Sequence, residues 1–198
     1  MNDNEKLFVA DFNTVEKHYT RMEFLDIIID ILENTIIPQN LSFDMGVWGE
    51  SFGGELEHYE SFEEYQKNIH QCGTTCCVLG WAASDKRLTD KGLCLDSEFS
   101  LSVHKGAELL HTYFEEDSLK DITGMEDYEL IMLFGPDSDE RLYAAYEWLH
   151  TTDDLNNEEF EESLPIHIKE DVNDPKLALD AMYWYKEKLL AGEVSKTT

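Results

Sequence analysis

Apolar side chains recur at intervals of three and four residues along most of this 198-residue chain, the spacing of amphipathic helices. Residues 20–35 are the clearest case, because Thr20 and Glu23 have the spacing of a capping box and acidic positions alternate with an apolar stripe. The stripe consists of Met22, Leu25, Ile28, Ile29 and Leu32. We predict a helix here, and we expect Pro38 to end it.

Further helices are predicted by the same spacing. They cover residues 61–70, 104–114, 125–136, 137–152 and 176–192. Gly135-Pro136 is a helix stop, Asp174-Pro175 has the composition of an N-cap followed by a first-turn proline, and Gly192 is a C-terminal glycine. Residues 39–56 are predicted to form a loop, in which a short hairpin is compatible with the sequence. The acidic stretch after residue 152 reads as a loop or short helix with room for an edge strand at 166–168.

The pattern predicts one mainly α (α or α+β) domain. Strand patterns are weak, and no segment of 20 to 50 residues repeats, which excludes a solenoid. We expect residues 1–198 to form a single compact helical domain around a buried central helix at about 76–83, with room for a small β element.

The central helix is predicted from residues 70–84, HQCGTTCCVLGWAAS, which contain three of the four cysteines. Every side chain from Cys76 to Ala83 is apolar or small, which is typical of a helix buried on all sides. Cys76, Gly80 and Ala83 would lie on one face, where a second helix can approach closely, and free cysteine behaves as a small hydrophobe. We favour this structural interpretation.

A zinc site is a second interpretation of the same stretch. The available soft ligands are His70, Cys72, Cys76 and Cys77, with Cys94 or His104 further along. The cysteine spacing is C-x3-C rather than the usual C-x2-C, and there is no second paired cluster. We therefore predict no metal and no cofactor.

A reactive thiol is the third interpretation. Thr74 or Thr75 could cap a helix that begins near Cys76, and a helix N-terminus lowers the pKa of a cysteine thiol. No motif fixes His70 or His104 beside a thiol as a base. We predict no catalytic residue, and a thiol- or zinc-dependent enzyme is left as the weaker alternative.

The stretch also resembles a known family. The pattern C-G-T-x-x-C-x-x-G-W-A, here Cys72 to Ala82, is similar to that of an uncharacterised family of small bacterial and phage proteins. The resemblance continues through GAELL, LFGP and RLYAAYEWLHTT, and covers about residues 68–152. It implies a helical core and a phage or mobile-element context, without an activity or site residues. The acidic segments 1–67 and 153–198 are additions to that pattern, where a function particular to this chain would lie.

Charge changes the functional interpretation most. Against 15 Lys and Arg the chain has 43 Asp and Glu, which gives a net charge of −28. Residues 71–110 are nearly neutral, so the excess lies in the segments on either side. A surface of this kind repels nucleic acid and anionic membranes and attracts basic partners. We expect no direct binding of nucleic acid or membrane.

These observations predict a nucleic-acid mimic. A helical protein that displays rows of carboxylates can occupy the basic cleft with which a DNA- or RNA-binding protein contacts phosphates. Such a protein would be a phage-encoded inhibitor of a host nuclease or defence protein. The alternative is a structural or interaction protein with an unrelated partner, and a homodimer is compatible with either.

Three groups of acidic residues are candidates for the contact. They are the row Glu23, Asp26, Asp30 and Glu33; the cluster Glu55, Glu57, Glu60, Glu63 and Glu64; and the cluster Asp153, Asp154, Glu158, Glu159, Glu161 and Glu162. We expect the interspersed aromatic residues Tyr59, Phe62, Tyr65 and Phe160 to anchor the contact, because interface hot spots are often aromatic.

The sequence contains no motif that points to any of the other function classes considered. Carboxylates are too abundant to single out a glycosidase pair, both alignments of an EF-hand loop on residues 153–165 fail, and there is no Walker A sequence. The first residues lack a basic region followed by an apolar run, so they predict no signal peptide. The longest apolar stretch, residues 24–37, is too short to span a bilayer. We expect a cytoplasmic protein, in the host cytoplasm if phage-encoded.

Overall fold

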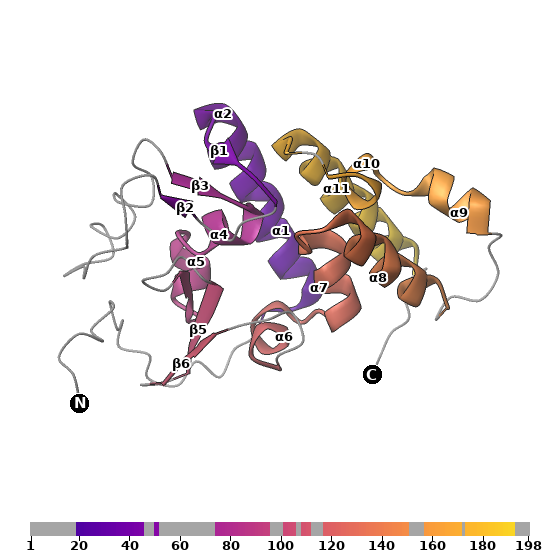
Figure 1. Ribbon diagram of the computed structural model, residues 1–198. Helices are drawn as coiled ribbons and strands as arrows, with labels where there is room; N and C mark the ends of the chain where they lie inside the picture. Colours follow the sequence, from indigo (N-terminus) through magenta and orange to yellow (C-terminus); the bar gives the residue numbers. More distant parts are fainter. Residues whose placement is uncertain are drawn as a thin grey trace.

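The computed structural model describes residues 19–45, 50–51, 74–95, 101–105, 108–111, 117–150, 157–171 and 173–192. The fold is mainly helical, as predicted, with two small three-stranded sheets. Figure 1 shows the strands gathered on one side of helix α1 and the helices α7, α8 and α11 on the other. Helix α1 therefore lies between the two halves of the described structure.

Helix α1 (Arg21–Ile31) begins with the predicted capping box, in which Glu23 N–H donates to Thr20 Oγ and Thr20 N–H donates to the Glu23 carboxylate. The prediction that Pro38 ends this helix is wrong. The chain continues through a π-helical turn, η1 (Leu32–Ile36), into α2 (Ile37–Gln39), and ends at Asn40 with φ 50°. In the wider turn Ile37 N–H donates to the Leu32 carbonyl, and such turns accommodate a proline that has no N–H of its own.

The central helix is shorter than predicted. Helix α4 is Val78–Ala82, and it follows a strand, β3 (Thr74–Cys76), so Cys76 belongs to a sheet. The predicted burial is confirmed, because every residue from Cys76 to Ala83 is buried. The β-branched pair Thr74-Thr75 favours a strand, which explains the later helix start.

Strand β3 is the middle strand of the first sheet. Strand β1 (Ser42–Phe43) runs parallel to it and β2 (Glu50–Ser51) antiparallel. The two short strands in the predicted loop therefore flank β3 and do not pair with each other as a hairpin. The Ser42 and Thr75 hydroxyls lie 2.7 Å apart across the parallel pair.

The helix predicted at 104–114 is wrong, because this region contributes to the second sheet. Strands β4 (Leu93–Leu95), β5 (Leu101–Lys105) and β6 (Glu108–His111) pair antiparallel in that order. Lys105 pairs with Glu108, and Gly106 follows Lys105 in the sequence, as is typical of tight hairpins. The alternation of apolar and polar residues in β5 is a strand signal that the helical spacing concealed.

Three of the remaining helices were predicted, namely α7 (Asp127–Phe134), α8 (Ser138–His150) and α11 (Pro175–Ala191), and α9 (Asn157–Ser163) is a short helix in the acidic stretch after residue 152. The apolar spacing did not predict the short helices α5 (Lys86–Thr89), α6 (Asp117–Thr123) and α10 (Ile166–Lys169). Gly135 ends α7, Asp174 caps α11, and Gly192 ends α11 at φ 73°, as predicted. The expected edge strand at 166–168 is instead helical, because Glu170 N–H donates to the Ile166 carbonyl. The predicted helix 61–70 lies outside the described residues.

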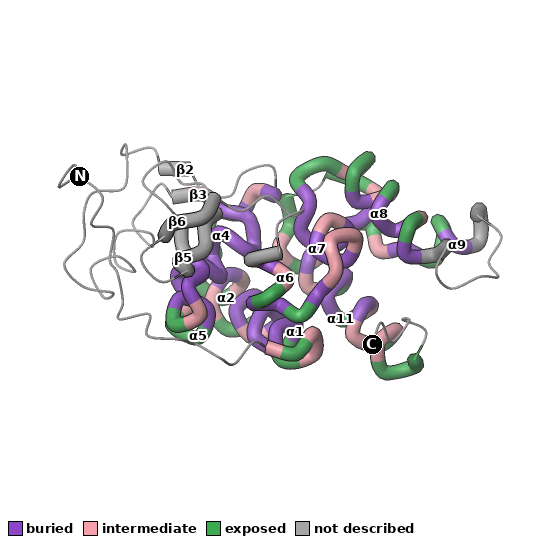
Figure 2. The backbone as a smooth tube through the Cα atoms, turned by 90° about the horizontal axis from the view of Figure 1, so that it is seen from below, coloured by how far each residue is buried: buried purple, intermediate pink, exposed green. Residues whose placement is uncertain are grey.

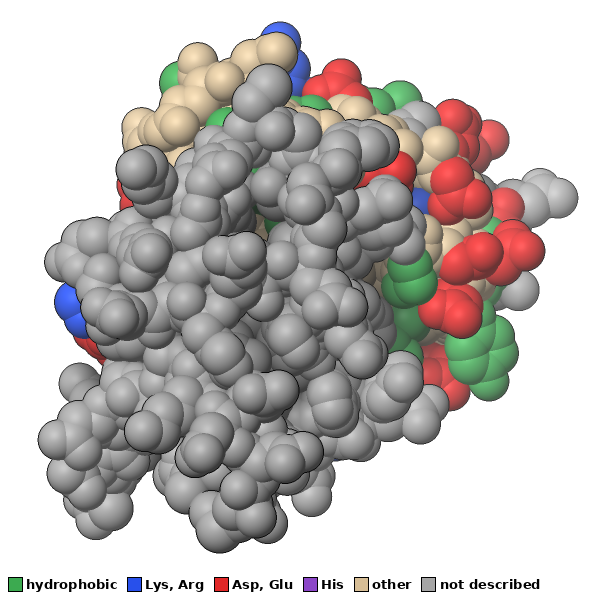
Figure 3. Space-filling model, turned by 60° about the vertical axis from the view of Figure 1, so that its left-hand side comes forward, with side chains coloured by type: hydrophobic (Ala, Val, Ile, Leu, Met, Phe, Trp, Pro, Cys, Tyr) green, Lys and Arg blue, Asp and Glu red, His purple; other side chains and the backbone are tan. Residues whose placement is uncertain are grey.

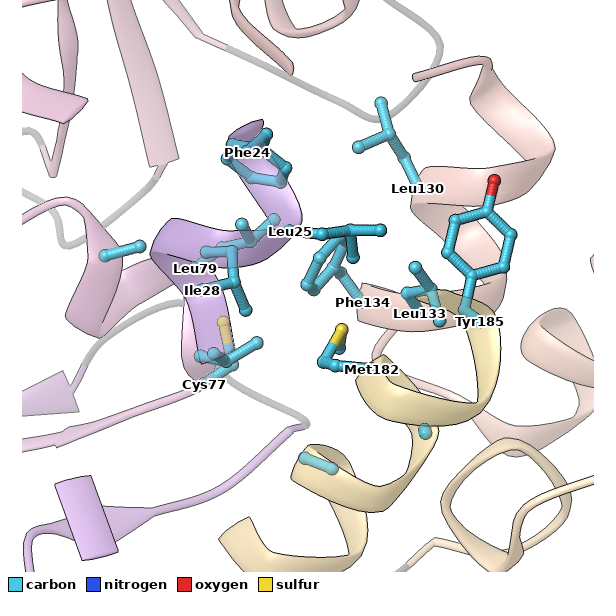
Figure 4. Packing of buried hydrophobic residues seen from close by; sticks show 14 of the residues in the cluster. Phe24, Leu25, Ile28, Cys77, Leu79, Leu130, Leu133, Phe134, Met182 and Tyr185 are labelled. Atoms are coloured by element: carbon cyan, nitrogen blue, oxygen red, sulfur yellow. The ribbon is translucent and has the colours of Figure 1, made fainter. Parts of the chain in front are cut away.

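The helices and sheets share one core. Phe24 and Ile28 of α1 lie between Leu79 of α4 and Phe134 of α7, and Met182 of α11 closes the same cluster (Figure 4). All five side chains are fully buried. Figure 2 shows the buried positions concentrated where α1, α4, α7 and α11 meet. None of the helices in the described ranges has the length and hydropathy needed to cross a membrane.

Candidate partner-binding surface

The buried side chain of Arg141 fixes the beginning of α8. Its Nε donates to the His167 carbonyl at 2.9 Å, Nη1 to the Gly135 carbonyl at 2.7 Å, and Nη2 to the Glu170 carbonyl at 2.9 Å. Nη2 also lies 3.1 Å from the carboxylate of Asp171, which accepts from Ser138 N–H. Burial lowers the pKa of Arg141, yet a guanidinium stays charged in proteins. The positive charge of Arg141 is therefore satisfied by groups of the protein itself and does not offset the exposed acidic residues of α8.

The opposite side of α8 presents acidic residues around an exposed tyrosine. Tyr143 is 67% exposed, with Asp139 and Glu140 one turn before it and Glu147 one turn after it. Residues three and four apart lie on the same side of a helix, so these four positions form one stripe. We call Asp139, Glu140, Tyr143 and Glu147 the α8 stripe.

The carboxylates of the α8 stripe face solvent. All three are exposed, and within the described parts of the chain none makes an ion pair or a side-chain hydrogen bond. Residues 137–171 contain just two Lys or Arg, namely Arg141, which is buried, and Lys169 on α10. Figure 3 shows red Asp and Glu side chains gathered along the right-hand edge of the molecule. The α8 stripe can attract a cationic partner without first breaking an internal ion pair.

Helix α9 carries part of the third predicted cluster. Glu161 and Glu162 are exposed; Glu161 accepts a hydrogen bond from the Tyr146 hydroxyl, whereas Glu162 has no partner among the described residues. Only the backbone is described for Glu158 and Glu159, and Asp153 and Asp154 lie outside the described residues. The described part of the cluster therefore lies on α9, just before the beginning of α10 at Ile166.

Phe160 does not have the predicted role of an exposed anchor. It is 2% exposed, and its ring centroid lies 6.0 Å from those of both Tyr146 and Trp148. The physical reason is that Phe160 is the one apolar side chain of α9, and α8 offers two aromatic rings to cover it. Phe160 attaches α9 to the protein.

The acidic row on α1 is paired inside the molecule. Asp26 lies 2.5 Å from Lys186 Nζ, Asp30 lies 2.7 Å from Arg87 Nη1, and Glu33 accepts a 2.6 Å hydrogen bond from the Tyr183 hydroxyl. The hydrogen bond from Arg87, with a second from Asn34, lowers the pKa of Asp30. Glu23 serves the capping box. A partner that bound this row would have to compete with these contacts.

The second predicted cluster cannot be compared with the other two. Glu55, Glu57, Glu60, Glu63 and Glu64 lie outside the described residues, as do the aromatic residues expected to anchor them, Tyr59, Phe62 and Tyr65.

A buried carboxylate, Glu129, joins three helices. It is fully buried, lies 3.0 Å from Arg21 Nη1 of α1, accepts from the Tyr185 hydroxyl of α11, and accepts from Glu126 N–H at 2.7 Å. Burial raises its pKa, although these hydrogen bonds and Arg21 oppose the rise. Because Glu129 has no access to solvent, we assign it to the packing of α7 against α1 and α11.

The described cysteines have the environment of core residues. Cys76 and Cys77 are buried thiols outside any disulfide, and Cys77 Sγ accepts a hydrogen bond from Gly80 N–H at 3.3 Å as the N-cap of α4. Burial raises the pKa of the Cys77 thiol to about 12 despite its position at a helix N-terminus. A thiol with this pKa is protonated at neutral pH and is a poor nucleophile.

No metal centre is formed by the residues in the described ranges, where His, Cys, Asp and Glu do not come together in groups of three or more. His70 and Cys72 lie outside those ranges, and the absence of a metal at residues 70–84 stays a prediction.

Sequence reasoning missed the two features that define this surface. The α8 stripe was readable, because Asp139, Tyr143 and Glu147 are spaced at four residues. The burial of Arg141 had no local signal, because all of its partners except Gly135 follow it by 26 to 30 residues. From the sequence alone, Arg141 would be taken for a surface cation that pairs with Asp139, Glu140 or Glu147.

Comparison with known proteins gives no relative: no protein-family model matches the chain, and neither a curated protein nor a solved structure shows significant similarity to it. The family resemblance of Cys72–Ala82 therefore stays a prediction. Function has to be argued from the geometry.

Proposed function

We propose that this protein is a binding protein that lays the acidic face of α8 and α9 on the basic nucleic-acid-binding surface of a partner protein. The observation that carries the proposal is the solvent-facing, unpaired state of the α8 stripe carboxylates, next to an arginine that is buried and used internally. The net charge of −28 supplies the long-range attraction.

Electrostatics explains why a nucleic-acid-binding protein is the best partner. Such proteins place Lys and Arg where phosphates lie, so their binding surfaces already complement a row of fixed negative charges. The helix fixes the backbone positions from which these carboxylates project, which reduces the entropy lost on association. An acidic protein of this kind competes with nucleic acid for the same surface.

The biological setting is part of the same proposal. The resemblance of residues 68–152 to small phage and bacterial proteins supports a phage-encoded inhibitor that acts in the host cytoplasm on a nuclease or defence protein. In this setting the protein has no catalytic residue of its own, and its effect is the occupation of the partner's cleft.

The experiment is capture of partners from a cytoplasmic lysate by the immobilised full-length protein, at low and at high salt, with identification by mass spectrometry. The proposal expects a DNA- or RNA-binding protein that is released as salt rises and that added duplex DNA or RNA displaces. A partner that is indifferent to both salt and nucleic acid would contradict mimicry and favour an interaction protein of another kind.

A further inference from the structure

We infer that Tyr143 makes the α8 stripe selective for arginine, so that the partner side chain docking there is a guanidinium and not an ammonium group. The inference rests on the proposed function only in that the arginine belongs to the partner's basic surface. It adds the identity of the contacting cation and the residue that recognises it.

The arrangement of the stripe fits a planar cation. The Tyr143 side chain is 67% exposed, and carboxylates stand on its own helix face three or four residues to either side. A guanidinium can stack on an aromatic ring while its N–H groups donate to a flanking carboxylate. A lysine ammonium is a compact, strongly hydrated charge without the planar fork that allows both contacts together.

Tyr143 differs from Tyr146 and Tyr183 in that its hydroxyl makes no hydrogen bond to another described residue. The Tyr146 hydroxyl donates to Glu161, and the Tyr183 hydroxyl donates to Glu33. In the described part of the chain the Tyr143 hydroxyl has no hydrogen-bond partner, and its ring has no aromatic neighbour. A tyrosine exposed to this extent on an ordered helix is available for a partner.

The occupant follows from charge complementarity. Asp139, Glu140 and Glu147 lie on the same helix face as Tyr143 and repel an acidic partner, and they would have to be desolvated beneath an apolar one. Arg141, which fixes the first turn of α8 from inside, keeps the stripe in one geometry. A cation with a flat face meets every one of these conditions.

The test uses blocked tri-arginine and tri-lysine peptides as probes of the full-length protein. Backbone amide shifts of Glu140 and Glu147, followed by NMR during each titration, give the dissociation constant at the α8 stripe independently of other acidic groups. We expect tri-arginine to bind more tightly than tri-lysine. Tyr143→Ala should reduce that preference about two- to fivefold, the strength of an exposed cation–π contact, while Tyr143→Phe should keep it.

The matched control is Tyr183→Ala, which removes an exposed tyrosine from α11 and should leave the preference unchanged. The inference is overturned if Tyr143→Ala leaves the arginine-to-lysine ratio at its wild-type value, or if Tyr183→Ala lowers that ratio equally.

The two proposals can fail separately. A ratio that depends on Tyr143, together with lysate partners that nucleic acid does not displace, supports arginine recognition and contradicts mimicry. A nucleic-acid-displaced partner, together with a ratio that ignores Tyr143, supports mimicry and overturns arginine recognition.

Discussion

Arg141 Nη1 donates a hydrogen bond to the carbonyl of Gly135 across the turn that joins α7 to α8. The other nitrogens of the same guanidinium donate to the carbonyls of His167, within α10, and of Glu170, the residue that caps its C-terminal end. One side chain therefore fixes where α8 begins, how α10 packs on it, and in which direction the α8 stripe faces.

Replacement of Arg141 by Met should lower the free energy of unfolding by about 3 kcal/mol or more, because it leaves buried carbonyls without donors. The matched control is Arg87→Met, which removes the same charge from an exposed ion pair and should cost about 1 kcal/mol or less. Urea denaturation of both variants measures the difference. Equal midpoints would show that the Arg141 network contributes no more than a surface ion pair.

Gly124 should tolerate alanine less well than Gly192. Both have positive φ, +67° and +73°, so each substitution costs about 1 kcal/mol for the left-handed backbone. At Gly124 a Cβ atom would also lie 2.8 Å from the Tyr19 carbonyl oxygen and 2.9 Å from the Arg21 nitrogen, whereas nothing lies within 4 Å at Gly192. Thermal unfolding should therefore show a larger loss for Gly124→Ala. If the two variants lost the same stability, the end of α6 and the start of α1 would have enough space between them for a Cβ atom at residue 124.

His167 should make stability depend on pH between about 6.5 and 4. Its pKa is lowered from the ordinary value to about 4, chiefly by burial and also by the charge of Arg141, against the opposing contact with the Leu133 carbonyl. Its Nδ1 is buried and has no hydrogen-bond partner among the described residues. As pH falls below about 6.5, the unfolded chain binds a proton that the folded protein does not, so folded stability decreases.

The variant His167→Gln isolates this effect. The difference in unfolding free energy between wild type and variant should fall by up to about 3 kcal/mol from pH 6.5 to pH 4, because every other titrating group cancels in the difference. Denaturation at several pH values measures it. A difference that stays constant over this interval would contradict a neutral, buried His167.

Local signals predicted much of the fold. The capping box of Thr20 and Glu23, the stop at Gly135, and the Asp174 cap with Gly192 at the other end of α11 are written in neighbouring residues. Such signals act within one helical turn, so one sequence is enough to find them.

Non-local pairing accounts for the errors. Strand β3 is stabilised by Ser42, 33 residues before Thr75, and β5 pairs with β4 and β6, while the apolar spacing at 104–114 imitates a helix. The site shows the same limit. All three acidic groups looked equivalent in the sequence, yet Asp26 and Asp30 are neutralised by Lys186 and Arg87, 160 and 57 residues away.

Charge reversal on α8 should weaken the captured partner's binding. In Asp139→Lys/Glu147→Lys, two solvent-facing carboxylates become like charges opposite a basic cleft, so the affinity should drop at least about tenfold. The matched control is Asp180→Lys/Glu187→Lys, which makes the same change of charge at exposed positions of α11. Circular dichroism should show both variants folded.

The affinity of these two variants for the captured DNA- or RNA-binding protein, measured at one salt concentration, is the most direct test that the acidic face of α8 is the binding surface. The account predicts that the α8 variant loses binding while the α11 variant binds nearly as wild type does. Equal loss in both would reduce the interaction to net charge, and full binding by the α8 variant would place the surface elsewhere on the protein.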